Sequence, residues 1–296
     1  MPRPGPGMTS SPATMELRTK TSAEPEFRLV VPSRAEHVAV VRQALSAAVE
    51  VLELSRSQLL DINAAVSEAC NNVVVHAYEG REGPLEVYLC IQEFGLEVIV
   101  SDEGVGIRAK APEPGLELQG LGLSLIQTLC DRVEFLGGIG RGTKVRMAFS
   151  LSDPVGEWMS EAPSGNHDVK PPPGELTIAV SAGALAAPVL GRVIGLLAAR
   201  AGFSLEGMSE AQLVTDSLAA HIPRVIVGDK IQLGIDRVDG VLVVRAGPLE
   251  EGGAERVLEA SALGDLPRVL DRLTKEHRIE AHEDGELLSL TLDGAR

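Results

Sequence analysis

In the first third of the chain, apolar residues recur at steps of three and four. They are Leu59, Ile62, Val66, Ala69 and Val73. This is the spacing of a buried helix face, so it predicts an amphipathic helix with one side in the core. Glu68, Asn72 and His76 then share a second face, because helical residues four apart lie roughly 5 to 6 Å from each other at Cβ.

The polar face of this helix carries groups that suit a phosphorylated ligand. The carboxylate of Glu68 can take a proton from a hydroxyl group, and the carbonyl oxygen of Asn72 is a hard ligand that suits Mg²⁺ beside phosphates. Two alternatives stay open at this point. Glu68 and Asn72 also fit a polar face in water, and His76 fits a packed, hydrogen-bonded core residue as well as a site residue.

A predicted strand leads into a second polar element. Residues 96–101 (LEVIVS) alternate weakly and are rich in β-branched side chains, which is typical of a strand. Asp102 follows directly, and Gly104 and Gly106 allow positive φ and close backbone approach. A flat ring with an amino group could then lie beside the Asp102 carboxylate. An ordinary hairpin turn is the alternative, because Asp and Gly are common in turns.

A glycine-rich loop comes before the third element. Residues 115–122 are loop-like and residues 121–130 predict a helix, so the backbone N–H groups at the helix start would attract phosphates. Many helix starts contain glycine, which makes this signal weak on its own. Residues 138–143 then predict a tight turn before a strand at residues 144–149, and the turn ends on the hydroxyl group of Thr143.

Together, these four elements resemble the N, G1, G2 and G3 boxes of the Bergerat-fold (GHKL) ATPases, the superfamily of gyrase, Hsp90, histidine kinases and MutL. Within it, the sequence is most similar to the serine-protein kinases of the anti-sigma factor group. The similarity rests on the EAxxNxxxHAY pattern that begins at Glu68, the short gap between Gly106 and Gly120, and the sequence DRVEF at residues 131–135. It covers roughly residues 26–151.

The resemblance implies a role for each matching residue. Glu68 would be the catalytic base, and Asn72 would bind the nucleotide and serve as the Mg²⁺ ligand. Asp102 would accept a hydrogen bond from the adenine amino group. The other nucleotide-binding residues that the resemblance implies are Gly104, Gly106, Gly120, Gly122 and Thr143, with the backbone of Leu121 and Leu123.

The resemblance also implies an activity. A kinase of this group binds ATP and Mg²⁺ and transfers phosphate to a serine or threonine of an anti-anti-sigma protein, or it holds a sigma factor inactive. The alternative is a non-catalytic ATP-binding module that grips a protein partner. Glu68 favours the kinase, because nucleotide binding alone requires Asn72 and Asp102 but no base. A sensor histidine kinase is not expected, since no second helix precedes the helix that begins near His37.

Composition narrows the classes of partner. The net charge of −15 argues against direct nucleic-acid binding and suits a protein partner with a basic face. The sequence has no run of about 18 apolar residues and no signal-peptide pattern, so we expect a cytoplasmic protein that binds no membrane. Its three cysteines lack metal-ligand spacing and are expected to be reduced and mostly buried.

Proline-rich segments divide the chain, whose 296 residues are enough for two domains of ordinary size. The expected order is a disordered tail at residues 1–24, an ATP-binding domain at 25–152, a Pro/Gly-rich linker at 153–174 and a second domain at 175–296.

The second domain resembles a degenerate copy of the first. Residues 175–180 (ELTIAV) can be laid on residues 26–31 (EFRLVV) without gaps, and the same offset lays the helix at 189–203 on the helix at 40–54. One residue of slippage then aligns Glu68 with Asp216 and Asn72 with Ala220. Further on, residues 240–245 (GVLVVR) match residues 95–100 (GLEVIV), which places Gly247 where Asp102 stands. Ala cannot hold Mg²⁺ and Gly cannot bind adenine, so the copy is expected to keep the fold without the site.

Both halves therefore predict an α+β fold, a two-layer sandwich with the helices on one face of a mixed sheet. The second half would be a degenerate domain of similar fold. It could dock on the first as an intramolecular pseudo-subunit, or it could hold a partner. The alternative is that two α/β segments of this size align loosely by chance.

Overall fold

The structure is a computed structural model that describes residues 25–92, 95–106, 121–138, 140–150, 169–261 and 269–294. The expected tail at residues 1–24 and residues 153–168 of the expected linker lie outside these ranges, as does Gly120. The proposed domain boundaries therefore stay predictions.

The first half alternates strands with helices in the order that the sequence pattern predicts. Its elements are β1 (Phe27–Pro32), α1 (Ala35–Val51), α2 (Arg56–Asn72), a π-helical turn (Val73–Ala77), β2 (Pro84–Gln92), β3 (Gly95–Asp102), α3 (Leu121–Leu129), β4 (Arg132–Gly137) and β5 (Thr143–Ser150).

The second half repeats this order with one additional short helix. Its elements are β6 (Leu176–Ser181), α4 (Ala186–Arg200), α5 (Leu205–His221), a 3-10 turn (Ile222–Arg224), β7 (Lys230–Val238), β8 (Val241–Leu249), α6 (Gly253–Ala260), α7 (Val269–Leu273), β9 (Glu276–His282) and β10 (Gly285–Asp293).

The second helix of each half begins at the same kind of cap. Ser55 forms a capping box before α2, in which its hydroxyl accepts a hydrogen bond from the Gln58 N–H (3.2 Å) and the Gln58 side chain accepts one from the Ser55 N–H (3.0 Å). Ser204 caps α5 by accepting a bond from the Gly207 N–H at 3.0 Å. Both helices are 17 residues long. The matching starts and lengths support the internal repeat.

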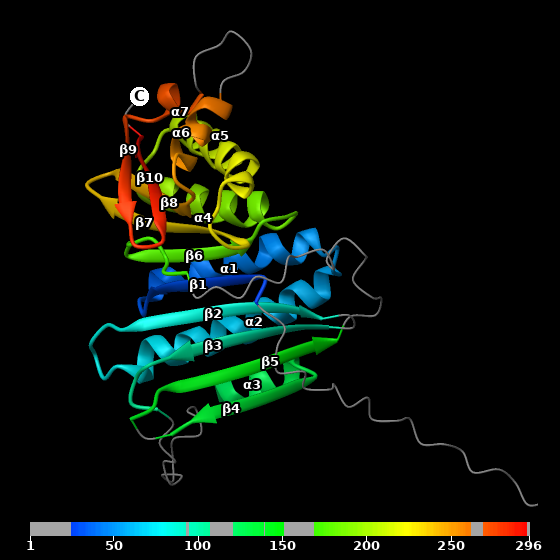
Figure 1. The fold of residues 1–296 in the computed structure, drawn as a ribbon. Helices are drawn as coiled ribbons and strands as arrows, with labels where there is room; N and C mark the ends of the chain where they lie inside the picture. Colours follow the sequence, from blue (N-terminus) through cyan, green and yellow to red (C-terminus); the bar gives the residue numbers. More distant parts are fainter. Residues whose placement is uncertain are drawn as a thin grey trace, which may run out of the picture.

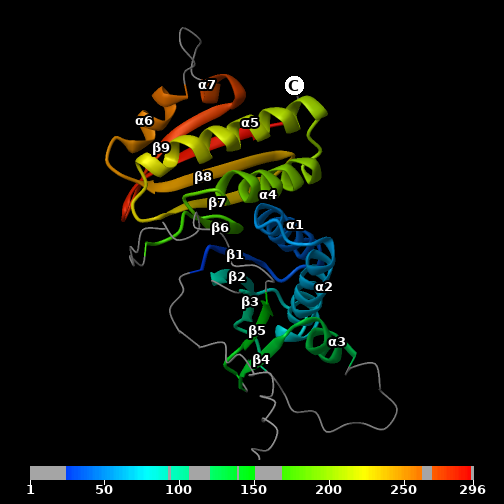
Figure 2. The same ribbon diagram turned by 90° about the vertical axis from the view of Figure 1, so that its right-hand side faces the viewer.

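The strands of both halves form one sheet of ten strands, in the order β4-β5-β3-β2-β1-β6-β7-β8-β10-β9 (Figure 1). The helices of both halves cover the same face of this sheet (Figure 2). Each half is thus the predicted two-layer α+β sandwich, and the two layers continue from one half into the other.

The expectation of a mixed sheet is wrong, because every neighbouring pair of strands is antiparallel. The reason lies in the connections. Two helices lie between β1 and β2 and between β6 and β7, so the chain reverses direction three times and the next strand returns antiparallel. A single crossover helix between neighbouring strands would have made them parallel.

The two halves meet at β1 and β6, which pair antiparallel along the middle of the sheet. Leu29 lies opposite Ile178, the residue that was laid on Leu29 in the sequence alignment. A residue that pairs with its own equivalent marks a two-fold axis, which is the geometry of an isologous dimer interface. The halves are therefore related by a pseudo-two-fold axis through this pair.

The described end of the expected linker contacts the second half. The carbonyl oxygen of Pro173 accepts a hydrogen bond from Arg245 Nη1 at 3.2 Å, and the Lys170 N–H donates to Asp284 Oδ2 at 3.0 Å. Gly234 on β7 makes room for this crossing, because a Cβ there would lie 2.2 Å from the Pro173 carbonyl oxygen. This segment is held against β7 and β8.

Two further expectations concern the thiols and the membrane. The three cysteines are free, and burial raises the pKa of the Cys70 and Cys130 thiols to about 12, so both stay protonated at neutral pH. Among the described residues, no helix combines the length and apolarity needed to cross a membrane.

The seam between the halves gives the first prediction. Leu29 is fully buried, whereas its neighbour Val30 is only partly buried, on the other face of the sheet. Leu29→Ala should lower the free energy of unfolding by about 2 to 5 kcal/mol through lost burial and a cavity. Val30→Ala should cost clearly less. Denaturant unfolding measures both, and similar losses for the two variants would contradict the buried seam.

Candidate nucleotide-binding site

Asp102 is the last residue of β3, and its side chain is buried, with 6% exposed. Its Oδ1 atom accepts hydrogen bonds from the Gly104 N–H (2.8 Å) and the Thr143 N–H (3.2 Å). Burial raises the pKa of Asp102, and these two N–H groups with the Thr143 hydroxyl lower it only in part. Both backbone bonds end on Oδ1, and neither uses Oδ2, the oxygen that could accept a bond from a ligand.

The loop after Asp102 packs against the end of the motif helix. The Val105 N–H donates to the Ala77 carbonyl oxygen at 2.8 Å, and a Cβ on Gly104 would lie 2.1 Å from that same oxygen. Gly106 has a φ of +76°, and a Cβ there would lie 2.0 Å from the Gly138 carbonyl oxygen. Larger residues would thus push apart the three segments that the sequence predicted as the N, G1 and G3 boxes.

Glu68 and Asn72 lie one turn apart on α2, and both are half-buried. The helix then changes to a π-helical turn at Val73–Ala77. Such turns are rare and often occur at functional sites. Here the turn ends at Ala77, whose carbonyl oxygen holds the loop after β3. His76 is exposed on this turn, so the alternative that it is a packed core residue is wrong.

The start of α3 lies directly against Glu68. A Cβ on Gly122 would lie 1.9 Å from Glu68 Oε1, so a larger residue there would displace the Glu68 carboxylate. The carboxylate of Glu68 and the first turn of α3 are therefore in contact, although 54 positions separate them in the sequence. Leu121 opens α3 and Leu123 is exposed on it, with 46% of its surface accessible.

The structure thus gathers most of the predicted site residues into two groups of contacting residues. Asp102, Gly104, Gly106 and Thr143 surround the end of β3, and the turn that extends α2 joins them through Ala77. Glu68 and Gly122 form the second group. The first group offers a buried acceptor for an amino group, with glycines beside it. The second offers a carboxylate, with an amide on the same helix face. These groups together fit adenine, phosphates and Mg²⁺.

Sequence reasoning assigned no role to Tyr78. Its hydroxyl accepts a hydrogen bond from the Glu103 N–H at 2.9 Å, one residue beyond Asp102. The only sequence signal was its place at the end of the EAxxNxxxHAY pattern.

The corresponding positions of the second half lack this chemistry. Because α2 and α5 have the same length and begin at equivalent caps, no slippage is needed, and the counterparts of Glu68 and Asn72 are Ser217 and His221. The alignment with Asp216 and Ala220 is wrong by one residue. Serine is a poor base and imidazole a poor ligand for Mg²⁺, so the conclusion that the copy lacks the site is unchanged.

The helix start after β8 is also occupied by a side chain of the protein. The carboxylate of Glu286 accepts hydrogen bonds from the Gly252 N–H (2.9 Å) and the Ala254 N–H (3.3 Å) at the start of α6. An internal anion thus takes the backbone donors that a phosphate would need.

Comparison with known proteins agrees with this geometry. Residues 31–149 match the family model described as the histidine kinase-like ATPase domain. Serine-protein kinase RsbW of Bacillus cereus (strain AH820) is 31% identical to the chain over 123 residues, which are 38% of this chain and 77% of RsbW. The anti-sigma F factor of Oceanobacillus iheyensis is 34% identical over 137 residues, 43% of this chain and 93% of that protein. The chain belongs to this family of anti-sigma factor serine-protein kinases.

A solved structure matches the chain less extensively. The histidine kinase domain of the Erythrobacter litoralis EL346 blue-light activated histidine kinase is 26% identical, covers 32% of this chain and 46% of its own, and has a TM-score of 0.28. The assignment to the anti-sigma factor kinase family rests on the sequence relatives.

Asp102 gives a prediction that separates function from stability. Its folded-state pKa lies above the ordinary value of about 3.9. Protonation of Asp102 therefore contributes fully to folding stability at pH values below the ordinary pKa. This contribution is lost as the pH rises through the folded-state pKa. Asp102→Asn should leave the ligand-free protein at least as stable at neutral pH, while ATP affinity falls about ten- to a hundredfold because two amino groups then face each other.

Thermal unfolding and calorimetric titration test this pair of effects. Asp61→Asn on α2 is the control for a lost negative charge and should change neither quantity much. ATP affinity of the parent chain should also fall as the pH drops through the raised pKa of Asp102. Unchanged ATP affinity in Asp102→Asn would disprove the role of this carboxylate.

Proposed function

We propose that the chain is an ATP-dependent serine/threonine protein kinase of the anti-sigma factor type. Its substrate would be an anti-anti-sigma protein, and a sigma factor held inactive would be its second partner. The observation that supports this proposal is the contact between Glu68 and Gly122, because it brings the Glu68 carboxylate to the helix start that would receive the phosphates. The net charge of −15 suits a partner with a basic face.

In this proposal each residue has a limited task. Asp102, held by the Gly104 and Thr143 N–H groups, orients the adenine. Asn72 would hold Mg²⁺, which neutralises phosphate charge when it is bound with ATP. Glu68 accepts the proton of the serine or threonine hydroxyl as that oxygen attacks the terminal phosphorus of ATP, while the bond from this phosphorus to the bridging oxygen breaks and ADP leaves. Backbone N–H groups at the start of α3 would receive the phosphate oxygens.

A pair of variants distinguishes the kinase from a non-catalytic ATP-binding module. Glu68→Gln should keep ATP affinity within a few-fold, while phosphate transfer falls by a factor of roughly 10² to 10⁴, the usual range for general-base assistance. Asn72→Ala should weaken both, because metal and triphosphate bind together. Asp61→Asn, two turns earlier on α2, is the charge-matched control.

Transfer of labelled phosphate from ATP to a candidate anti-anti-sigma protein gives the readout. Persistent transfer in Glu68→Gln would place the base elsewhere. ATP binding without transfer to any candidate by the parent chain would favour the non-catalytic module.

We also propose that the second half acts as an intramolecular pseudo-subunit. The pseudo-two-fold axis at Leu29 and Ile178 is the arrangement that two identical subunits would adopt. Helix α1 packs on α4 beside this seam, and both helices bury an apolar face. The second half would then take the position of a second kinase subunit without its nucleotide site.

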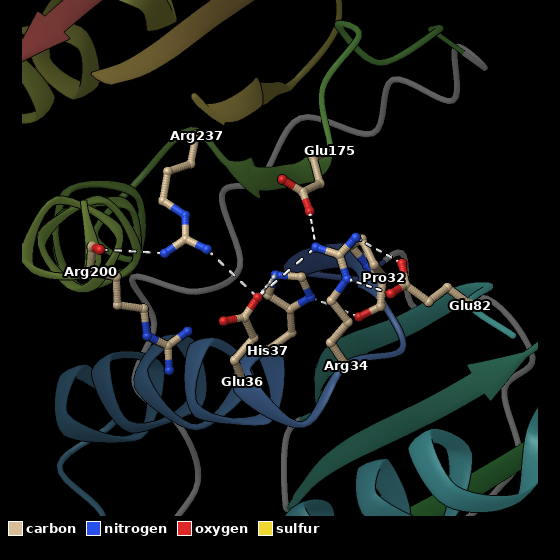
Figure 3. Close-up of polar contacts among 8 residues, drawn as sticks. All are labelled: Pro32, Arg34, Glu36, His37, Glu82, Glu175, Arg200 and Arg237. Atoms are coloured by element: carbon tan, nitrogen blue, oxygen red, sulfur yellow. Dashed lines mark hydrogen bonds and ion pairs between the residues drawn. The ribbon is translucent and has the colours of Figure 1, made fainter. Parts of the chain in front are cut away.

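Ion pairs across the seam match the two halves to each other (Figure 3). Arg34 lies between Glu82 of its own half and Glu175 of the other, at 2.8 and 2.6 Å. Arg237 approaches Glu36 at 3.7 Å. Exposed pairs of this kind contribute little to stability. Such pairs favour specificity, because charges that match across an interface fix how its two sides meet.

The outer edges of the sheet favour a single chain over a larger assembly. The edge strands are β4, with Arg132 and Glu134, and β9, with Glu276, Arg278 and Glu280. Charged edge strands disfavour the addition of another strand. Strand β1, by contrast, is already paired with β6 and offers no free edge.

Light scattering and nucleotide titration test the pseudo-subunit. The full chain should be a monomer that binds one ATP. A chain that ends at Asp153 exposes β1 and should form a dimer that binds two. A full chain that is a stable dimer, or one that binds two ATP molecules per chain, would contradict the proposal.

A further inference from the structure

Tyr78 connects the loop beside Asp102 to the rest of the sheet. Its hydroxyl donates a hydrogen bond to the Pro84 carbonyl oxygen at 2.5 Å and accepts one from the Glu103 N–H at 2.9 Å. Pro84 opens β2, and Glu103 follows the last residue of β3. One side chain thus joins the end of the motif helix, the start of β2 and the loop after β3.

The ring of Tyr78 is held as firmly as its hydroxyl. A Cβ on Gly83 would lie 2.2 Å from the ring atom Cε1, so the backbone at Gly83 lies directly on the ring. The Gly83 N–H is itself fixed by a hydrogen bond to Ser33 Oγ at 3.1 Å. The hydroxyl therefore has little freedom to follow the loop if the loop moves.

The hydrogen bond between the Tyr78 hydroxyl and the Glu103 N–H holds the peptide next to the Asp102 carboxylate. The Glu103 N–H belongs to the peptide unit that Asp102 begins, and the following N–H, of Gly104, bonds to Asp102 Oδ1. The Glu103 side chain is exposed. Without the phenol, water would satisfy the Glu103 N–H, so the loss would affect the order of the loop more than the fold.

We infer that Tyr78 is a positioning residue of the nucleotide site, which fixes the peptide after Asp102 and thereby the direction of its carboxylate. The inference rests on the proposed role of Asp102 in binding adenine. It adds a specificity function: a correctly directed carboxylate accepts the adenine amino group and rejects the guanine carbonyl. Tyr78 contacts neither the phosphates nor the acceptor in this role, so it affects base recognition and not transfer.

Tyr78→Phe keeps the ring and removes both hydrogen bonds. ATP affinity should fall about three- to tenfold, as expected for the loss of roughly one hydrogen bond. The ratio of ATP to GTP affinity should fall by a similar factor. Phosphate transfer at saturating ATP should stay within about twofold, because Glu68 and the start of α3 are unchanged. Amide exchange at Glu103 and Gly104 should accelerate, with the rest of β3 unaffected.

The chain contains a matched control, because it has only two tyrosines. Tyr88 on β2 is also half-buried, and its hydroxyl is bonded to Glu86, away from the loop after β3. Tyr88→Phe should leave ATP affinity, the ATP to GTP ratio and the exchange of Glu103 at parent values. Both variants are compared as full-length protein, with thermal unfolding to verify the fold.

The outcomes separate this inference from the kinase proposal. Unchanged nucleotide affinities and unchanged exchange at Glu103 in Tyr78→Phe would overturn the positioning role. Equal effects of Tyr78→Phe and Tyr88→Phe would overturn it as well, since the loss would then be general. A parent chain that binds ATP but transfers no phosphate would overturn only the kinase proposal, because the affinity and exchange measurements require no turnover.

Discussion

The antiparallel pairing of β1 with β6 is the interaction on which the rest of this structure depends. Without it, each half would expose a strand edge with unpaired backbone groups beside an apolar helix layer. With it, ten strands form one sheet, and residues of both halves belong to one hydrophobic core. Leu29 and Ile178 lie at the centre of this pairing, where the pseudo-two-fold axis passes. The orientation of every other element in one half relative to the other follows from this seam.

The candidate nucleotide site lies away from the seam and has opposite requirements. The seam buries apolar side chains such as Leu29 and Ile178, whereas the site buries the carboxylate of Asp102 at a pKa above its ordinary value. It also depends on glycines, such as Gly104 and Gly122, at points where a Cβ would collide with Ala77 or Glu68. Such residues reduce stability or leave backbone freedom. The hydrogen bonds that Asp102 accepts from the Gly104 and Thr143 N–H groups, and that Tyr78 accepts from the Glu103 N–H, offset part of that loss by fixing the loop.

The two halves show how a fold persists when a site is lost. Fold-determining features recur in both, such as the helix caps Ser55 and Ser204 and the central residues Leu29 and Ile178. The site depends on few positions, and the second half has Ser217 where the first has Glu68. Its helix start after β8 is filled by the Glu286 carboxylate. An architecture persists as long as apolar faces stay buried, which many residues can do. A binding site requires specific chemical groups at specific positions.

Much of the first half could be predicted from the sequence, because the deciding patterns are local. The three- and four-residue spacing around Glu68 predicted α2, and the β-branched run before Asp102 predicted β3. The spacing of the motifs indicated the family, which the relatives confirmed. The internal repeat was also visible, since equivalent residues such as Leu29 and Ile178 align without gaps.

Only the tertiary structure decided how distant segments meet. An alternating strand has the same pattern in either direction, so the sequence determined neither the fully antiparallel sheet nor the partner of β1. It did not determine the contact of Glu68 with Gly122 or the bonds of Tyr78 to Glu103 and Pro84, because these join residues from separate elements. The sequence by itself determined the elements and the chemical groups of the site. Long-range packing decided which of those groups face each other.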